Sequence, residues 1–88
     1  MDREEIRAKI KEIIANIANL SAEEIGDHVS LKDDLGLDSL SMLEIAVDVD
    51  FEFKLDLPQE KLSVINTVQD AVELAQEYLH KKEALLAY

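Results

Sequence analysis

The chain has 88 residues, with twenty acidic and nine basic side chains and a formal net charge of −11. This length suits one small domain with a single core, and the absence of cysteine excludes a disulfide framework and a thiolate metal site. Nucleic acid and anionic membrane surfaces would be repelled, so we expect neither as a partner and favour proteins with basic surfaces. The sequence contains no apolar run long enough to cross a bilayer and no signal-peptide pattern. We therefore expect a soluble, cytoplasmic, monomeric protein.

The first predicted helix covers about residues 3–19. Asp2 precedes this helix and Glu5 lies in its first turn. The two have the spacing of a capping box, in which each side chain bonds to the other residue's backbone N–H. Apolar residues then recur at three- and four-residue intervals, which predicts one buried face. The members of this face are Ile6, Ile10, Ile13, Ile14, Ile17 and Leu20. Ser21 and Glu24 repeat the capping pattern and predict one further short turn.

Residues 27–38 form the longest predicted connection. Its apolar residues are spaced as separate anchors rather than as a continuous helical face, and they are Val29, Leu31, Leu35 and Leu37. A loop that is pinned in this way would lie across the helices and bring Ser39 to an exposed tip. His28 in this loop and the distant His80 have no plausible partner nearby in the sequence, so we interpret both as solvated.

The second predicted helix covers about residues 39–53 and carries two apolar stripes when residues are placed at about 100° intervals. The stripe predicted to face the core contains Met42, Ile45, Ala46, Val49 and Phe53. The stripe on the opposite flank contains Leu40, Leu43, Val47 and Phe51. Because a helix needs only one apolar stripe to pack on a core, the second stripe either is covered by other helices or forms an exposed docking ridge. We favour the ridge, and the core alternative stays open.

Pro58 fixes φ and suits the first position of a helix. The residues after it therefore predict a short third helix, with Leu62 and Ile65 turned inward. Thr67 and Asp70 have the spacing of reciprocal capping partners and predict the start of a fourth helix. The predicted buried stripe of that helix contains Val68, Ala71, Val72, Ala75, Tyr78 and Leu79.

These patterns predict an all-α fold, a small four-helix bundle with a long first loop and a short third helix. We expect a single domain over residues 1–88, with a helical core of about 3–79. Residues 80–88 are interpreted as a C-terminal extension that continues the last helix and frays.

Ser39 follows Asp38 at the point where a glycine-containing loop ends and the second predicted helix begins. The simplest interpretation is that the pair caps the helix. The donors and partial positive charge of such a terminus also suit a phosphate, so Ser39 is well placed to carry a phosphodiester. The sequence Leu-Gly-Leu-Asp-Ser-Leu at 35–40 closely resembles the prosthetic-group attachment site of acyl carrier proteins, and residues of about 31–79 resemble that family throughout.

This resemblance implies that Ser39, flanked by Asp38 and Leu40, bears 4′-phosphopantetheine taken from coenzyme A by a phosphopantetheinyl transferase (holo-acyl-carrier-protein synthase). It implies a carrier rather than an enzyme, which holds acyl chains as thioesters for acyl-loading and condensing enzymes of fatty-acid, polyketide or related lipid synthesis. In this family, partner enzymes recognise the second helix. The matching positions here are Leu40, Leu43, Glu44, Val47, Asp50 and Phe51.

The second helix also departs from the fatty-acid carriers, which typically have acids where this chain has Ser41 and Phe51. A specialised carrier for another acyl pathway is therefore an open interpretation, and an acidic helical adaptor without a prosthetic group is the alternative function. A serine hydrolase is disfavoured because no Gly-x-Ser-x-Gly elbow surrounds Ser39. The acidic stretch 48–52 lacks the glycine turn of a calcium-binding loop, so we predict no metal site.

Overall fold

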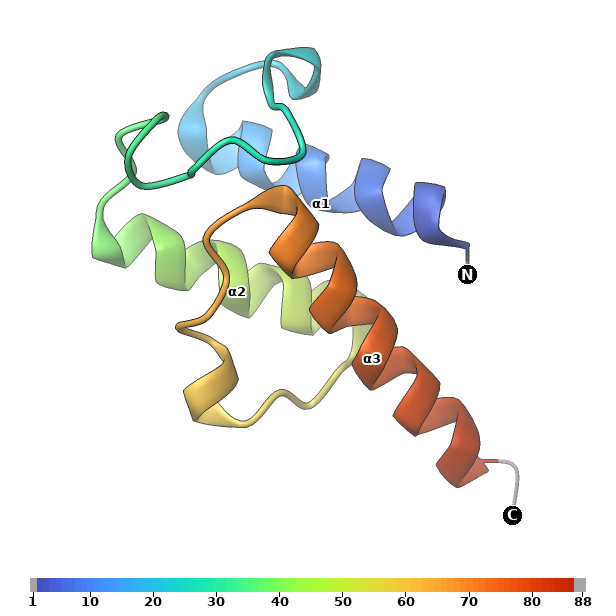
Figure 1. Ribbon diagram of the computed structural model, residues 1–88. Coiled ribbons are helices and arrows are strands. Elements are labelled where there is room, and N and C mark those ends of the chain that lie inside the picture. Colours follow the sequence, from blue (N-terminus) through green and yellow to red (C-terminus); the bar gives the residue numbers. More distant parts are fainter. Residues whose placement is uncertain (1, 87–88) are drawn as a thin grey trace.

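The computed structural model describes residues 2–86, which form three α-helices and two single 3₁₀ turns without any strand. In chain order these elements are α1 (Arg3–Ala18), η1 (Ala22–Glu24), α2 (Ser39–Phe53), η2 (Gln59–Lys61) and α3 (Val68–Leu86). Each α-helix packs against the other two, and the last turns of α3 extend beyond α1 and α2 (Figure 1). The all-α prediction is confirmed, but the predicted four-helix count is not.

The capping signals in the sequence mark the helix starts. The Asp2 carboxylate accepts a hydrogen bond from the Glu5 N–H at 2.9 Å, and α1 ends where Asn19 adopts a left-handed conformation with φ of 59°. At the start of α3, the Asp70 N–H donates to the Thr67 hydroxyl and the Thr67 N–H donates to the Asp70 carboxylate, both at 3.0 Å. These local bonds replace the backbone partners that the first turn of a helix lacks.

The predicted third helix is a single 3₁₀ turn. Pro58 has an extended conformation, with φ of −62° and ψ of 151°, so it precedes the turn instead of opening a helix. The Lys61 N–H donates to the Pro58 carbonyl at 2.9 Å and the Leu62 N–H to the Gln59 carbonyl at 3.1 Å, which is the three-residue pattern of a 3₁₀ turn. This segment offers too few buried apolar side chains to stabilise several α-helical turns, because helix stability in proteins comes mostly from packing of an apolar face.

The core lies where the three α-helices meet, and it includes anchors from the loops. Helix α2 turns its predicted inner stripe into this core, with Met42 only partly buried. The buried side chains are Ile6, Ile10, Ile14, Ala15, Ile25, Leu31, Ile45, Ala46, Val49, Phe53, Leu55, Ile65, Val68, Ala71, Val72, Leu74 and Ala75. Leu74 was missing from the predicted stripe of α3, whereas Tyr78 and Leu79 are half-buried members of it.

The long loop between α1 and α2 is fixed to the start of α3 at two points. The Leu31 side chain is fully buried, and its N–H donates to the Asn66 carbonyl at 2.8 Å. Nearer the start of the loop, the Asp27 carbonyl accepts from the Gln69 N–H at 3.0 Å. Both bonds tie the loop to the beginning of α3, so the chain enters α2 at a defined place.

The predicted C-terminal extension is helical as far as Leu86, where α3 ends. The fraying predicted for the 80–88 extension stays a prediction, and residues 87–88 lie outside the described part of the chain. No helix within residues 2–86 is both long enough and apolar enough to span a membrane.

Candidate functional site

Ser39 is the first residue of α2, and its side chain is exposed. The chain reaches this position through Gly36, whose φ of 70° lies in the left-handed region that favours glycine. A side chain at Gly36 would meet open space, so the backbone conformation rather than crowding calls for glycine there. Leu37 then packs half-buried against the core, and its N–H donates to the Leu31 carbonyl at 3.1 Å. The loop therefore delivers Ser39 to a fixed and accessible position.

Asp38 is the N-cap of α2. Its carboxylate accepts a hydrogen bond from the Ser41 N–H at 2.8 Å. This bond lowers the pKa of the Asp38 carboxyl below its ordinary value because it stabilises the ionised form. An ionised carboxylate held in this way is a weak proton acceptor, so Asp38 caps the helix and is poorly suited to activate the Ser39 hydroxyl as a base.

A groove with a volume of about 520 Å³ opens beside Ser39. Its apolar lining comes from Met42, Leu43, Leu62 and Ile65, and its polar lining from Lys32, Ser39, Ser63 and Asn66. The groove thus lies between α2, the turn at residue 32 and the segment that precedes α3. Its walls combine an apolar floor with a polar rim, which is the usual character of a site for a small amphipathic ligand.

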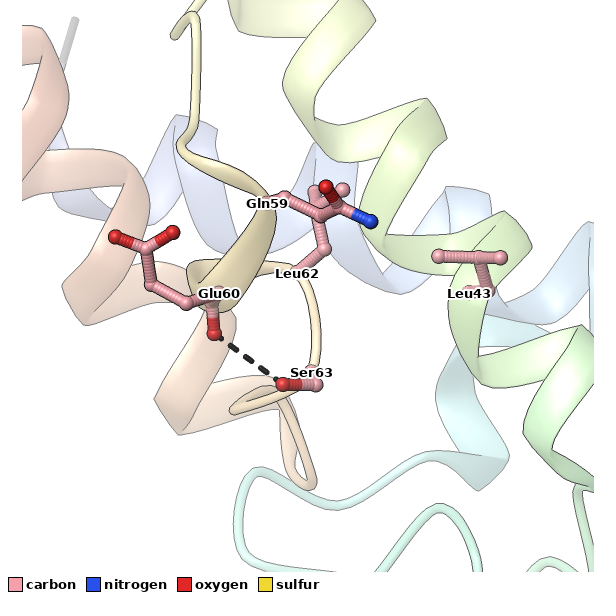
Figure 2. Close-up of a pocket in the computed structure, with 5 residues that line it drawn as sticks. All are labelled: Leu43, Gln59, Glu60, Leu62 and Ser63. Carbon is pink, nitrogen blue, oxygen red and sulfur yellow. Dashed lines mark hydrogen bonds between the residues drawn. The ribbon is translucent and has the colours of Figure 1, made fainter.

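A second hollow of about 560 Å³ adjoins the first on the side of η2. Figure 2 shows Leu43 on α2 facing Gln59 and Leu62 across this hollow, with Glu60 and Ser63 on the same side as η2. The Ser63 hydroxyl donates to the Glu60 carbonyl at 3.2 Å, which closes the turn after η2 (Figure 2). Because both hollows share Leu43, Leu62 and Ser63, they form one groove that runs from Ser39 toward η2.

The predicted outer stripe of α2 is exposed. Leu40 is 66% exposed, Phe51 85%, and Leu43 and Val47 47% each. Glu44 is exposed as well. The other helices therefore leave this stripe uncovered in the isolated chain, which removes the core alternative for these four side chains. Their role in docking stays a prediction.

Asp50 has a structural role that its position in the sequence did not reveal. It is half-buried, and its carboxylate accepts a hydrogen bond from the Leu57 N–H at 3.1 Å. Its carbonyl accepts another from the Leu55 N–H, also at 3.1 Å. Asp50 therefore fixes the chain as it leaves α2, and it is less available to a partner than Glu44.

Sequence reasoning missed three polar residues of the groove, Lys32, Ser63 and Asn66. They come from two segments about thirty positions apart, and no local spacing pattern links them. His28 and His80 are exposed, as predicted. Within the described residues, no group of three His, Cys, Asp or Glu side chains lies close enough to hold a metal ion.

Residues 8–75 match the family model described as the phosphopantetheine attachment site. An acyl carrier protein from Rubrobacter xylanophilus is 36% identical over 78 residues, which cover 89% of this chain and 96% of that protein. A solved structure of the acyl carrier protein from Enterococcus faecalis is similar with a TM-score of 0.73 and 33% identity, covering 89% of this chain and 99% of that one. The chain therefore belongs to the acyl carrier proteins, whose prosthetic group is 4′-phosphopantetheine.

Proposed function

We propose that the Ser39 hydroxyl is the attachment point of 4′-phosphopantetheine, and that the protein delivers acyl groups to enzymes of fatty-acid, polyketide or related lipid synthesis. The observation that carries this proposal is the exposed Ser39 at the start of α2, within the matched family range of 8–75. The residues around it fit the group, because an exposed hydroxyl opens onto a groove with an apolar floor. When bound, the group supplies a thiol that can carry an acyl chain as a thioester.

The chain itself is proposed to be a carrier and not a catalyst. Among residues 2–86, no side chain that could act as a base is hydrogen-bonded to the Ser39 hydroxyl. Asp38 is engaged with the Ser41 N–H, and neither His28 nor His80 lines the groove at Ser39. A serine hydroxyl needs an adjacent base or a lowered pKa to become a good nucleophile. Modification would therefore depend on groups supplied by a phosphopantetheinyl transferase.

The outer stripe of α2 is the proposed contact surface for that transferase and for acyl-loading and condensing enzymes. Leu40 and Leu43 lie close to Ser39 along the helix, and Val47 and Phe51 continue the stripe toward its other end. Exposed apolar side chains gain free energy when a partner removes them from water. Glu44 and the net charge of −11 favour partners with basic surfaces.

The groove between α2 and η2 is the proposed shelter for the acyl chain. Its apolar side chains line a path that starts beside Ser39 and passes Leu43 and Leu62. Because the path is open to solvent along its length, a chain could enter from the side without unfolding the core. The apolar lining of the groove suits a small apolar cargo.

The modification itself gives the direct test. Incubation with coenzyme A, magnesium and a phosphopantetheinyl transferase should add one phosphopantetheinyl group to the wild type, as measured by mass spectrometry. Ser39→Ala should remain unmodified, with an unchanged circular dichroism spectrum because the side chain is exposed. Ser41→Ala is the matched control from the same turn and should be modified like the wild type.

Two results would contradict the proposal. Modification of Ser39→Ala would place the attachment elsewhere. A wild-type protein that several transferases leave unmodified, and that also lacks the group when isolated from its native host, would favour the acidic adaptor instead.

A further inference from the structure

Lys32 is presented by a rigid turn of the long loop. The preceding residue, Leu31, is fully buried, and its N–H donates to the Asn66 carbonyl at 2.8 Å. On the other side of Lys32, the Asp33 N–H donates to the Ser30 hydroxyl at 3.0 Å. The backbone of Lys32 is therefore held from both directions, although its side chain is exposed. Its position relative to the neighbouring groove is thus defined by the fold.

Lys32 is the one charged residue in the lining of the first hollow, which lies at Ser39, whereas Glu60 lines the second hollow at η2. Within residues 2–86, no carboxylate lies within 4.0 Å of its ammonium group, in contrast to the paired cations of α1 and α3. Of the nearby aspartates, Asp34 and Asp38 each accept a backbone N–H hydrogen bond at 2.8 Å, and the exposed Asp33 carboxylate does not reach the Lys32 ammonium within 4.0 Å. An anion in the groove would therefore find an unpaired cation.

We propose that Lys32 binds the phosphodiester that would link the prosthetic arm to Ser39. The inference rests on the proposed modification of that serine. A diester on the Ser39 oxygen adds a negative charge next to the ionised Asp38, in a chain whose net charge is already −11. A cation in the same groove offsets this repulsion. Lysine suits the task because its ammonium is a compact point charge on a flexible stem.

The contact would also set the direction in which the arm leaves Ser39. Lys32 and Asn66 belong to the same wall of the groove, across from the α2 residues Met42 and Leu43. A phosphodiester held at Lys32 starts the arm over the apolar floor, to which Leu43 belongs, instead of over Leu40, Val47 and Phe51, the residues of the outer stripe that do not line the groove. Lys32 therefore acts as a positioning residue that favours the sheltered arrangement. Because both charges are exposed, added salt weakens the contact.

Phosphorus NMR of the modified protein tests the proposal. Wild type, Lys32→Gln, Lys32→Arg and Lys9→Gln are modified with coenzyme A and a transferase, checked by mass spectrometry, and their phosphorus spectra are compared. Lys9 is exposed on α1 and outside the groove lining, so Lys9→Gln makes the same charge change away from the site. We expect Lys32→Gln to shift and narrow the phosphorus resonance, Lys32→Arg to restore it, and Lys9→Gln to match the wild type. Sodium chloride should move the wild-type resonance toward that of Lys32→Gln.

Identical phosphorus spectra for wild type and Lys32→Gln would overturn the assignment. A wild-type resonance that does not move with salt would overturn it as well, and this measurement needs no variant. A wild type that accepts no phosphopantetheinyl group fails at the mass-spectrometry step, before any spectrum is recorded. That failure would contradict the modification of Ser39, so the two proposals fail at different steps.

Discussion

Asp27 joins the long loop to α1 through two cations. Its carboxylate lies 2.9 Å from the Lys11 ammonium and 3.4 Å from the Arg7 Nε. The close Lys11 ammonium is the main cause that lowers the pKa of the Asp27 carboxyl, and the charge of Arg7 acts in the same direction. A carboxyl whose pKa is lower in the folded than in the unfolded protein stabilises the fold only while it is ionised.

Acid should therefore remove the contribution of Asp27. It is fully present above the ordinary carboxyl pKa of 3.8 and is lost as the pH falls through the lower pKa of the folded state. We expect Asp27→Asn to reduce the free energy of unfolding by about 1 kcal/mol at neutral pH, since the carboxylate is partly exposed. The difference from wild type should disappear in strong acid, as measured by denaturant unfolding at several pH values. Asp33→Asn, in the same loop but without an ion pair in the described chain, is the control. Equal losses for both variants at neutral pH would refute the role of the pair.

Only some of these side-chain contacts could be predicted from the sequence. The bonds of Asp2, Thr67 and Asp38 were predictable because an N-cap and its partner lie within three positions in the sequence. The ion pair of Asp27 with Lys11 joins positions sixteen apart, and its existence depends on how the loop folds back on α1. The structural role of Asp50 was likewise not visible in the sequence, so this residue was assigned to the partner surface. Its bond to the Leu57 N–H forms only when the chain turns after α2.

At the scale of elements, α2 combines a buried face with an exposed face that we propose to be a docking surface. Val49 on the inner face is 0% exposed, whereas Val47 on the outer face is 47% exposed. The two positions carry the same side chain two residues apart in one helix, so they form a matched pair. Packing holds the inner face against α1 and α3. The outer face is available for a second protein.

Truncation of each valine should separate the packing role of the inner face from the docking role proposed for the outer face. Val49→Ala removes two buried methyl groups and leaves a cavity, so we expect a loss of roughly 2 kcal/mol in the free energy of unfolding. Val47→Ala should change stability by less than about 0.5 kcal/mol. It should instead speed dissociation from a partner enzyme by about fivefold, for a loss of about 1 kcal/mol of contact. Thermal melting and surface-based binding kinetics on both variants measure the two effects. A Val47→Ala protein that melts far below wild type would show that the outer stripe is part of the core.

The extent of each element followed from the sequence where apolar spacing and capping agreed. Helix α2 was predicted as residues 39–53 and has those bounds, because Asp38 caps it and its inner stripe packs on the core. The length of the element after Pro58 was overestimated, because a proline indicates where a helix can begin but not how many turns packing will stabilise. The groove beside Ser39 could not be predicted from the sequence, because its walls meet only when α2, the loop and the segment before α3 are assembled.

At the scale of the whole molecule, the acidic surface opposes compactness. Among the twenty carboxylate side chains, only Glu4, Asp27 and Glu77 lie within 4.0 Å of a cationic side chain in residues 2–86. The net charge of −11 is therefore mostly unpaired, and its self-repulsion raises the free energy of the folded state. The same charge would attract basic partners over a distance. A high negative charge would therefore favour recognition while it lowers stability.

Salt should therefore stabilise this protein. Ions screen repulsion between exposed charges over about 10 Å at 0.1 M ionic strength, and magnesium should act at lower concentrations because of its higher charge. A gain of about 1 kcal/mol would raise the melting temperature by about 4–8 °C in a domain of this size. Near the sequence pI of about 4.4 the net charge is small, so the same salt titration should have much less effect there. Melting curves followed by circular dichroism at both pH values, with sodium chloride and with magnesium chloride, measure the difference. A melting temperature at neutral pH that stays constant or falls as salt is added would mean that the fold tolerates its unpaired carboxylates without strain, and the acidity would then matter for recognition alone.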